Sequence, residues 1–563
     1  MVNLSSKKLS SWLLLLVGIA TIVLINLLAN RFFFRIDLTE EKRYTISEAT
    51  RNMLGGLDDV VYVDVYLAGD LPAGFKRLHN SIRETLDEFK VYAGENLQFR
   101  FIDPTKAESQ KARNEFFTSL AEKGIQPTNI MDQSSGQRTE KLVFPGVVIS
   151  YGDEETGVML LKGSKAAGAQ QQLNQSIEGL EYELATAIQK LIKVDQYRIG
   201  IVQGYDDLDT LQLAGLTSSL MQSYRVVYTN LPARSDLSGL DAIIIAKPRR
   251  AFSESDIYKI DQFIMRGGKA LLLIDALYVE MDSVGGDGTF AVPFDLNLDN
   301  LLFKYGVRIN QDFVLDMNAG VYPVVAGRMG DQPQVRMLPW PYYPLVNQFS
   351  KHPAVRNTDA VLTRFISSID TVKAEGITKT PMFFSSQYSR IVKAPVRVSM
   401  NDLRQEMRPE YFTAGKIGLG WMLEGSFTSL YKNRILPDGI NKENFIADGQ
   451  PAAIFICADG DLARNEINPK TGQALELGYE PYTQTRYANE DLLVNTLNYM
   501  LDNEGLISAR SKEITIRPLD KVKIEQEKTY WQLLNVLLPV VIILAFGIIK
   551  GVLRKKKYSS FGK

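Results

Sequence analysis

The chain of 563 residues has few of the side chains that usually carry chemistry, with one cysteine, Cys457, and two histidines, His79 and His352. One cysteine excludes an intrachain disulfide, a four-cysteine zinc site and a CxxC redox motif. No H-E-x-x-H sequence is present, so a histidine-based zinc site is not expected either. We therefore predict no bound metal.

The sequence also lacks a phosphate-binding loop and an excess of either charge. No G-x-x-x-x-G-K-[ST] motif occurs, which excludes ATP hydrolysis by the P-loop route. The 64 lysine and arginine residues are balanced by 65 aspartate and glutamate residues, so no overall field attracts nucleic acid. We predict no catalytic residue, no cofactor and no nucleic-acid partner.

The composition is that of an ordinary folded protein, with 45% hydrophobic and 23% charged residues. Domains usually contain about 100 to 200 residues, so this length predicts two to four folded units.

A long apolar run lies near the N-terminus, from Trp12 to Ala29, and contains no charged residue. At about 1.5 Å per residue it is long enough to cross a membrane as a helix. A cleaved signal peptide is the alternative, but its apolar region is usually about 7 to 15 residues and no A-x-A site follows. A buried soluble helix is a second alternative, although it would usually show a polar face. We predict a membrane-spanning helix over residues 11–30.

A second apolar run, from Trp531 to Ile549, predicts another membrane-spanning helix over residues 530–550. A core helix with a basic tail is the alternative. Basic residues concentrate on the cytoplasmic side of membrane spans. The tail of residues 551–563 is basic, so we place it in the cytoplasm. Because the chain would cross the membrane twice, the N-terminal residues 1–10 are predicted on the same side as the tail. We therefore predict an inner membrane protein with the bulk of its chain in the periplasm.

Between the two runs, strands and helices alternate, which predicts an α/β fold class. A strand at 60–67, a helix at 76–93 and a strand at 97–102 predict a βαβ unit, preceded by a helix that Ser47 caps. A hairpin is expected at 142–161. The helical spacing of apolar residues then predicts a long helix from Gln171 to Ile192.

A second α/β region begins near residue 196. Strands are predicted at 198–202, 225–228, 242–246, 269–275 and 453–458, with intervening helices, as in a parallel sheet. Ser253 is expected to cap the helix that runs to Met265. Residues 280–450 alternate less regularly, with a glycine-rich loop at Gly285–Gly288 and a helix near 296–305. The predicted division is a membrane-proximal domain (31–170), a bridging helix (171–195), a central domain with insertions (196–505) and a linker (506–529).

Two groups of residues are candidates for a ligand or partner surface. Asp459, Asp461 and Asn465 follow a predicted strand, where open α/β sheets bind ligands, and their oxygens suit a hard cation. An N-capping turn is the favoured alternative.

The second group is Trp340, Tyr342 and Tyr343, whose rings could stack on a sugar or anchor a partner protein. Packing in the core or in a loop is the favoured alternative. Cys457 stands before a turn, where a nucleophile could sit, but its apolar neighbours favour a small buried hydrophobic residue.

Four stretches of the sequence carry a resemblance to a known family. They are R-x-D-L-T-x-x-K-x-Y-T-x-S at 35–47, SIEGLEYEL at 176–184, the run from Asp241 to Asp275, and HPAVRNTDAVLTRFISSIDTV at 352–372. With both apolar ends, the chain resembles the GldG family of gliding-motility-associated ABC transporter auxiliary or substrate-binding proteins.

This resemblance implies a GIFT-type central domain, similar in fold to class I glutamine amidotransferases, and work with an ABC transporter permease and a cytoplasmic ATPase. Relatives often carry G-H-G-E after the first strand of that domain. This chain has Gly204-Tyr205-Asp206-Asp207 there, so a role tied to that histidine is not expected.

Three functions remain as hypotheses. The leading one is a non-catalytic, membrane-anchored auxiliary subunit of an ABC transporter complex in gliding motility. The alternatives are an extracytoplasmic glycan or solute receptor, or scaffold, independent of a transporter, and an extracytoplasmic enzyme that uses Cys457.

Overall fold

The computed structural model describes residues 4–31, 45–106, 109–132, 139–162, 168–193, 196–279, 281, 284, 288–329, 332–404, 406–438, 442–502, 504–511 and 521–559. It contains two units, residues 1–512 and residues 513–563. Several residues of the predicted motifs lie outside the described part: Arg35, Asp37, Leu38, Thr39, Lys42, Tyr44, Gly285 and residues 512–520 of the linker predicted at 506–529.

The first module of the larger unit is a four-stranded sheet in the order β2-β1-β5-β6. Strands β1 (Val61–Val65) and β2 (Leu97–Phe101) are parallel, and β5 (Gly146–Tyr151) and β6 (Glu154–Met159) form an antiparallel hairpin. Helix α3 (Ala73–Ala93) connects β1 to β2, so the predicted βαβ unit and hairpin are confirmed. A small antiparallel hairpin, β3 (Thr128–Asp132) and β4 (Thr139–Val143), lies between β2 and β5 in the chain.

Side-chain alternation along these strands builds two apolar layers. Val147 and Ile149 of β5 face a core shared with α2 (Glu48–Gly55), α3 and α5 (Ala169–Ile192), while Val148 faces α4 (Gln110–Glu122). Ser47 caps α2 as predicted, because its side chain accepts a hydrogen bond from the Thr50 N–H. Helix α5 begins two residues earlier than predicted and ends at the predicted residue.

The second module is an eight-stranded sheet in the order β17-β20-β23-β24-β10-β9-β7-β8. The strands are β7 (Arg198–Gln203), β8 (Arg225–Asn230), β9 (Ala242–Ala246), β10 (Lys269–Leu273), β17 (Gln348–Phe349), β20 (Ile377–Phe384), β23 (Gly418–Thr428) and β24 (Asp448–Cys457). Strands β24, β10, β9, β7 and β8 are parallel, as predicted. Strands β17, β20 and β23 extend this sheet in antiparallel fashion, which the sequence pattern did not predict.

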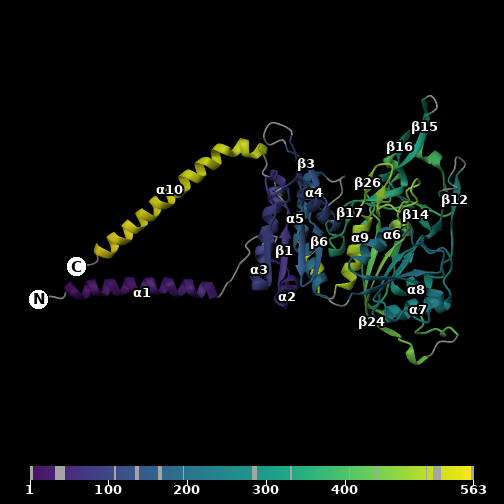
Figure 1. Ribbon diagram of the computed structural model, residues 1–563, viewed down its shortest axis with the longest axis horizontal. Coiled ribbons are helices and arrows are strands. Elements are labelled where there is room, and N and C mark those ends of the chain that lie inside the picture. Colours follow the sequence, from purple (N-terminus) through teal and green to yellow (C-terminus); the bar gives the residue numbers. More distant parts are fainter. Residues whose placement is uncertain are drawn as a thin grey trace. The chain divides into compact units, whose positions relative to one another are not determined.

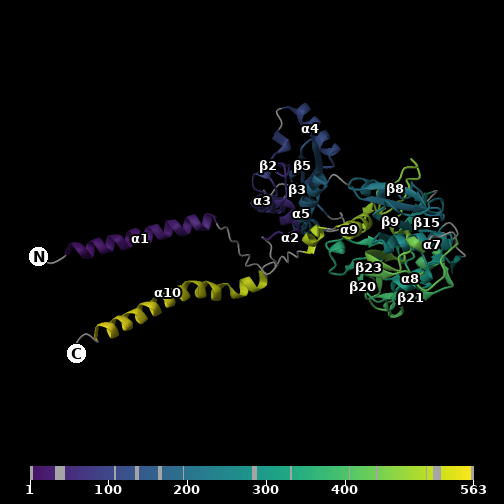
Figure 2. The ribbon, with the colours of Figure 1, turned by 90° about the horizontal axis from the view of Figure 1, so that it is seen from below.

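Helices cover both faces of this sheet (Figures 1 and 2). Along β24, Phe455 and Cys457 face a core with α6 (Ala214–Met221) and α9 (Asn489–Leu501), whereas Ile454 and Ile456 face α7 (Glu254–Met265) and α8 (Asp299–Tyr305). Strands buried on both faces carry nearly continuous apolar runs, as in AIIIA of β9. The module is therefore a three-layer, doubly wound sheet.

The irregular region of the sequence contains a long antiparallel ribbon and several short strands. The ribbon is formed by β15 (Ala319–Met329) and β16 (Gln332–Val346), which project in Figure 1. Prolines in β16 hid this strand from sequence analysis, because proline disfavours a central strand but is tolerated at an edge. The short strands are β11 (Leu277–Tyr278), β12 (Thr289–Pro293), β13 (Val307–Ile309), β14 (Asp312–Asp316), β18 (Val361–Leu362), β19 (Ile369–Thr371), β21 (Ser389–Lys393), β22 (Val396–Val398), β25 (Tyr479–Glu480) and β26 (Thr485–Arg486).

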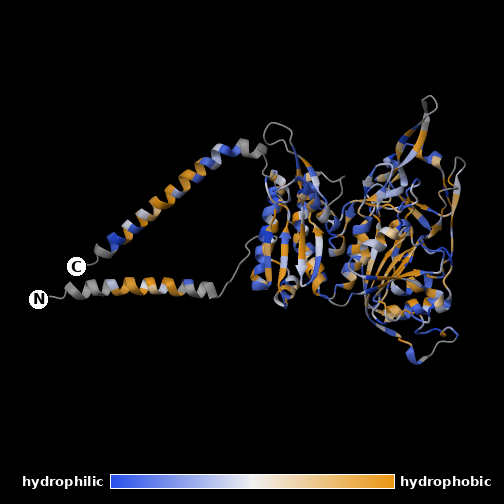
Figure 3. Cartoon of the chain, in the orientation of Figure 1, coloured by the Kyte–Doolittle hydropathy of each residue, from blue (hydrophilic) through white to orange (hydrophobic). Residues whose placement is uncertain are grey.

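The smaller unit contains helix α10 (Lys521–Ser559). Its segment Glu527–Lys556 is, among the described residues, the one helix long and apolar enough to cross a membrane. Figure 3 shows the apolar residues along its middle and polar residues at its ends. Helix α1 (Leu4–Arg31) covers the first predicted span, but its described apolar stretch, Trp12–Leu24, is shorter, so the first span stays a prediction.

A buried carboxylate on α7 joins α7, α8 and the loop after β23. Asp261 is fully buried and accepts hydrogen bonds from Tyr305 Oη (2.9 Å), Ser429 Oγ (2.7 Å) and the Leu430 N–H (2.9 Å). Asp261→Ala leaves these donors unsatisfied, so we expect it to lower the free energy of unfolding by about 3 kcal/mol or more. Urea denaturation of the full-length protein in mild detergent measures this.

Asp370→Ala is the matched control, because Asp370 is half exposed and pairs with the exposed Arg308. That change should cost less than about 1 kcal/mol. Equal losses for the two variants would contradict the structural role of Asp261.

Candidate functional site

The carboxyl ends of the parallel strands meet at one edge of the large sheet, where open α/β sheets bind ligands. The segments that follow these strands are Gly204–Asp207 after β7, Lys247 after β9, Asp275 after β10 and Asp459–Asp461 after β24. Strand β7 has its chain neighbour β8 on one side and β9 on the other. The switch point of the topology therefore lies between the ends of β7 and β9.

A buried lysine occupies this edge. The Lys247 ammonium forms a salt bridge with Asp461 and lies 3.3 Å from Asp275 Oδ2. Lys247 is 7% exposed and has a left-handed backbone with φ of 55°. Such a backbone is strained for a residue with a side chain, so the surrounding contacts must hold it.

The carboxylates of this edge are satisfied from within the protein. Asp275 accepts the Gly460 N–H at 2.6 Å, and Asp459 accepts the N–H groups of Asp461 at 2.8 Å and Arg364 at 2.7 Å. Asp459 thereby caps the short helix Gly460–Ala463, which is the turn that the sequence favoured. These donors leave the oxygens with few sites for an external cation.

Burial and the lysine shift the pKa values of these carboxyls in opposite directions. Burial, together with the neighbouring carboxylates Asp461 and Asp275, raises the pKa of Asp459 well above its usual value. Burial also opposes ionisation of Asp461, but the charges of Lys247, Arg464 and Arg364 outweigh it and lower the pKa of Asp461. The salt bridge with Lys247 therefore involves an ionised Asp461.

Close packing also leaves no space between Lys247 and the turn after β24. A Cβ added at Gly460 would lie 2.6 Å from Lys247 Cγ and 2.9 Å from Lys247 Cα. The lysine stem thus packs directly against the backbone of the β24 turn. A ligand at this position would have to displace a paired, buried ammonium group.

Asn465 does not join Asp459 and Asp461 in a common ligand set. Its side chain accepts the Gly215 N–H at 3.2 Å and donates to the Leu475 carbonyl at 2.6 Å. It therefore attaches the start of α6 to the chain after β24. In the part of the chain that the structure describes, no three histidine, cysteine, aspartate or glutamate side chains are grouped to hold a metal ion.

The switch point carries two more acids, of which Asp256 is buried and Asp207 is partly buried. Tyr205 stacks on Phe252 with ring centroids 3.9 Å apart, and its hydroxyl donates to Asp256. Asp207 accepts the Tyr205 N–H at 2.8 Å through Oδ2, while its Oδ1 is buried without a hydrogen bond from the described residues. Burial raises the pKa of Asp207 to about 6. Tyr205 is a core residue here.

A cleft lies beside the end of β10. It has a volume of about 320 Å³, and its polar lining includes Asp275, Asp295, Asp299 and Gln311. Burial, with the nearby Asp295, raises the pKa of Asp299. Asp275 connects this cleft to the Lys247 cluster.

The predicted aromatic surface lies inside the protein. Trp340 is fully buried, and Tyr342 and Tyr343 are 6% and 5% exposed. The Trp340 ring lies 4.8 Å from Tyr343 and 5.6 Å from Phe365, in the core beneath the ribbon. This is the packing alternative, and covered rings offer no stacking platform to a sugar in this structure.

Cys457 is likewise fully buried in the core against α9. Burial raises the pKa of its thiol well above the usual value, which disfavours the thiolate. Its position is that of a small hydrophobic residue.

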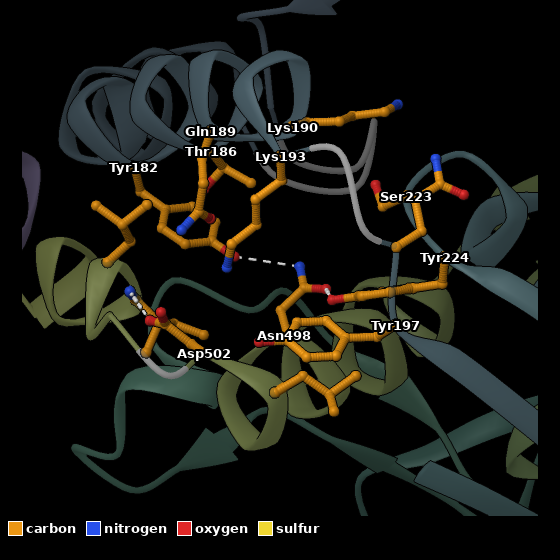
Figure 4. Close-up of a pocket in the computed structure, with 14 residues that line it drawn as sticks. Tyr182, Thr186, Gln189, Lys190, Lys193, Tyr197, Ser223, Tyr224, Asn498 and Asp502 are labelled. Atoms are coloured by element: carbon orange, nitrogen blue, oxygen red, sulfur yellow. Dashed lines mark hydrogen bonds between the residues drawn. The ribbon is translucent and has the colours of Figure 1, made fainter. Parts of the chain in front are cut away.

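A pocket that sequence analysis missed lies at the opposite, amino edge of the sheet (Figure 4). It has a volume of about 100 Å³ and lies between α5 of the first module and the elements α9 and β8 of the second. Asn498 bridges the two sides, because Tyr224 Oη donates to its Oδ1 at 2.6 Å and its Nδ2 donates to Tyr182 Oη at 3.2 Å. The sequence signal is a polar stripe on α5 at i, i+4, i+7, i+8 and i+11: Tyr182, Thr186, Gln189, Lys190 and Lys193.

The geometry defines a two-module α/β protein joined to an apolar helix, with ion pairs that connect the ends of β9, β10 and β24 at the ligand edge of its main sheet. The family model described as an ABC-type uncharacterized transport system matches residues 196–496, and this chain belongs to that family. The family describes an auxiliary component of an ABC-type transport system. A second model, for a domain of unknown function, matches residues 40–150, which include most of the first module.

Two similar proteins add to this comparison. A protein of Borreliella burgdorferi described as uncharacterized is 24% identical over 413 residues, which are 71% of this chain and 74% of that protein. The solved mmIFT52 N-terminal domain aligns with a TM-score of 0.29 and 10% identity over 54% of this chain and 98% of its own.

Lys247→Met tests whether the ion pairs of Lys247 stabilise the carboxyl edge of the sheet. It leaves Asp275 and Asp461 buried without their ammonium partner, so we expect the free energy of unfolding to fall by about 3 to 5 kcal/mol at neutral pH. Urea denaturation followed by circular dichroism measures this. Lys432→Met is the control, because its pair with Asp448 is exposed, and it should cost less than about 1 kcal/mol. A Lys247→Met protein as stable as the control would show that the cluster is not needed to hold this edge.

Asp207→Asn tests the switch-point acid through the pH dependence of stability. Because the folded state raises the pKa of Asp207 to about 6, the native protein binds this proton more tightly than the unfolded chain. Its contribution is present at pH values below about 4 and is lost as pH rises through 6. Between pH 4 and 7 the wild type should therefore lose about 1 to 2 kcal/mol relative to Asp207→Asn, after allowance for partial exposure.

Denaturation midpoints at pH steps across this range, with Asp370→Asn as an exposed control, check the expectation. Parallel pH profiles for wild type and Asp207→Asn would contradict it.

Proposed function

We propose that this protein is a non-catalytic, membrane-anchored auxiliary subunit of an ABC transporter complex, of the GldG kind that serves gliding motility. Its central region would be a GIFT-type domain, related to the class I glutamine amidotransferase sheet. Its partners would be a transporter permease and a cytoplasmic ATPase. The match to the transport-system family supports the transporter partnership.

The observation that carries the non-catalytic role is the Lys247 cluster. At the edge where a doubly wound sheet would place substrate, the ends of β9, β10 and β24 are occupied by a salt-bridged lysine and by carboxylates that bind backbone N–H groups. The one cysteine is buried in the core with a raised thiol pKa. We infer that the sheet is a scaffold that presents its outer surfaces to other subunits.

We propose two membrane spans, one in α1 and one in α10, with both termini in the cytoplasm and the two modules in the periplasm. The apolar segment Glu527–Lys556 supports the second span. It ends in the basic residues Arg554, Lys555 and Lys556, which favour the cytoplasmic side. In this arrangement residues 31–170 form a membrane-proximal domain, residues 171–195 a bridge, residues 196–505 the GIFT-like domain and residues 506–529 the linker to the membrane.

Affinity purification of the full-length protein from native membranes in mild detergent tests the partnership. We expect a P-loop ATPase and a multispanning permease to copurify in a fixed ratio, because an auxiliary subunit has no ATPase motif of its own. Cys457→Ser should retain both partners. Recovery of the protein without them would favour the scaffold or receptor alternative.

The single buried cysteine makes the topology directly measurable. In a Cys457→Ser background, Asp370→Cys and Lys555→Cys place one exposed thiol in the sheet module and one in the tail. A membrane-impermeant maleimide applied to spheroplasts of a Gram-negative host should label Asp370→Cys, while Lys555→Cys should react only after the membrane is broken. Labelling of both thiols in intact spheroplasts would contradict two spans with cytoplasmic ends.

A further inference from the structure

The pocket between the modules is built from side chains that are held in place before any ligand arrives. Both ends of the Asn498 amide are used by tyrosine hydroxyls, one from α5 and one from the start of β8. Asp502 accepts the N–H groups of Gly505 at 2.9 Å and Ile507 at 2.7 Å, which holds the chain that forms the floor. The walls therefore need little reorganisation to bind a molecule.

The floor and walls are largely apolar and aromatic. The rings of Tyr182, Tyr197 and Tyr224 line the pocket, and Leu506 and Ile507 are buried beneath it. Engineered cavities of about 150 Å³ hold a benzene molecule. A pocket of about 100 Å³ can therefore enclose an aromatic ring in part, or a short branched chain.

One polar group on this wall, the Thr186 hydroxyl, is at most weakly satisfied by the protein, through its neighbour Tyr182. The Thr186 hydroxyl is buried, and no described residue gives it a hydrogen bond of standard geometry. Thr186 lies one turn of α5 beyond Tyr182, on the face that lines the pocket (Figure 4). A buried hydroxyl with no bond of standard geometry still has capacity for a ligand that carries a polar atom at this point.

The rim carries charges of both signs, but Asp502 and Glu504 are already engaged within the protein, which leaves Lys190 to attract an anion. Lys193 lies 3.1 Å from Glu504, which also accepts a hydrogen bond from Gln189. Lys190 runs along the rim in Figure 4, and no carboxylate among the described residues pairs with it. Burial lowers the pKa of Lys190, as expected where a positive charge is desolvated without compensation.

We propose that this pocket binds a small carboxylic acid with an aromatic or branched apolar body, which contacts both modules at once. The apolar body lies against the tyrosine rings, the carboxylate faces Lys190, and Thr186 supplies a hydrogen bond. Bound between α5 and α9, such an acid stiffens the joint between the modules. This inference does not depend on the transporter partnership.

Saturation-transfer NMR on the full-length protein in detergent tests the proposal, with benzoate as the probe and benzyl alcohol as its uncharged counterpart. Empty micelles give the background. We expect benzoate to bind with a Kd of about 1 mM, which is typical for a ligand of this size, and benzyl alcohol to bind more weakly. Lys190→Met should weaken benzoate at least tenfold and leave benzyl alcohol unchanged.

Two further variants complete the test. Lys269→Met is the matched control, because Lys269 is another partly buried lysine whose pKa is lowered by burial, and it does not line the pocket. It should bind benzoate as the wild type does. Thr186→Met, which fills the pocket from α5, should abolish binding of both probes. Benzoate signals no larger than those of empty micelles, or equal in wild type, Lys190→Met and Thr186→Met, would overturn the proposal.

Discussion

The salt bridge of Lys247 with Asp461, supported by Asp275, holds the carboxyl ends of three neighbouring strands together. Burying an ammonium group and two carboxylates costs several kcal/mol for each ion, and mutual pairing offsets that cost only when the geometry is good. The chain meets this condition with a strained backbone at Lys247 and with backbone N–H groups that satisfy the remaining carboxylate oxygens. The turns after β9, β10 and β24 are thereby fixed relative to one another.

This constraint also explains why the usual ligand edge of the sheet carries no open site around Lys247. The lysine stem packs against Gly460. The hydrogen bond from the Arg364 N–H to Asp459 attaches the chain around Arg364 to the turn after β24. Binding functions are then left to other surfaces, such as the cleft beside Asp275 and the pocket at the opposite edge.

The joint between the modules has a different character from the cores on either side. Each core is apolar, whereas the joint uses tyrosine hydroxyls, one asparagine amide and a lysine–glutamate contact around a pocket. Polar contacts of this kind are modest in net energy because water competes for the same groups. A small molecule that fills the pocket adds apolar contacts to both modules, so its binding would stiffen the joint between them.

Much of the fold could be read from local patterns. The apolar runs AIIIA and AIFICA marked strands buried on both faces, and Ser47 and Ser253 marked helix starts that the structure confirms. These features depend on neighbours in the chain, so a single sequence is enough to reveal them. The ribbon of β15 and β16 was missed, because the prolines of β16 oppose a central strand. They are tolerated here because β16 pairs with β15 alone over that stretch, and β18 joins it only at Leu345 and Val346.

The candidate site likewise has features that the sequence predicts and features that depend on tertiary contacts. The sequence by itself determined that Asp459 and Asp461 end a strand, that the chain lacks a phosphate-binding loop, and that an apolar segment lies near each end. Only the tertiary structure decided that Lys247, more than 200 positions away from Asp461, closes that edge, and that Trp340 and its neighbours pack inside. It also brought α5 to α9 around the pocket. The physical reason is that ion pairing and burial depend on contacts between residues far apart in the chain, whose distances no local periodicity encodes.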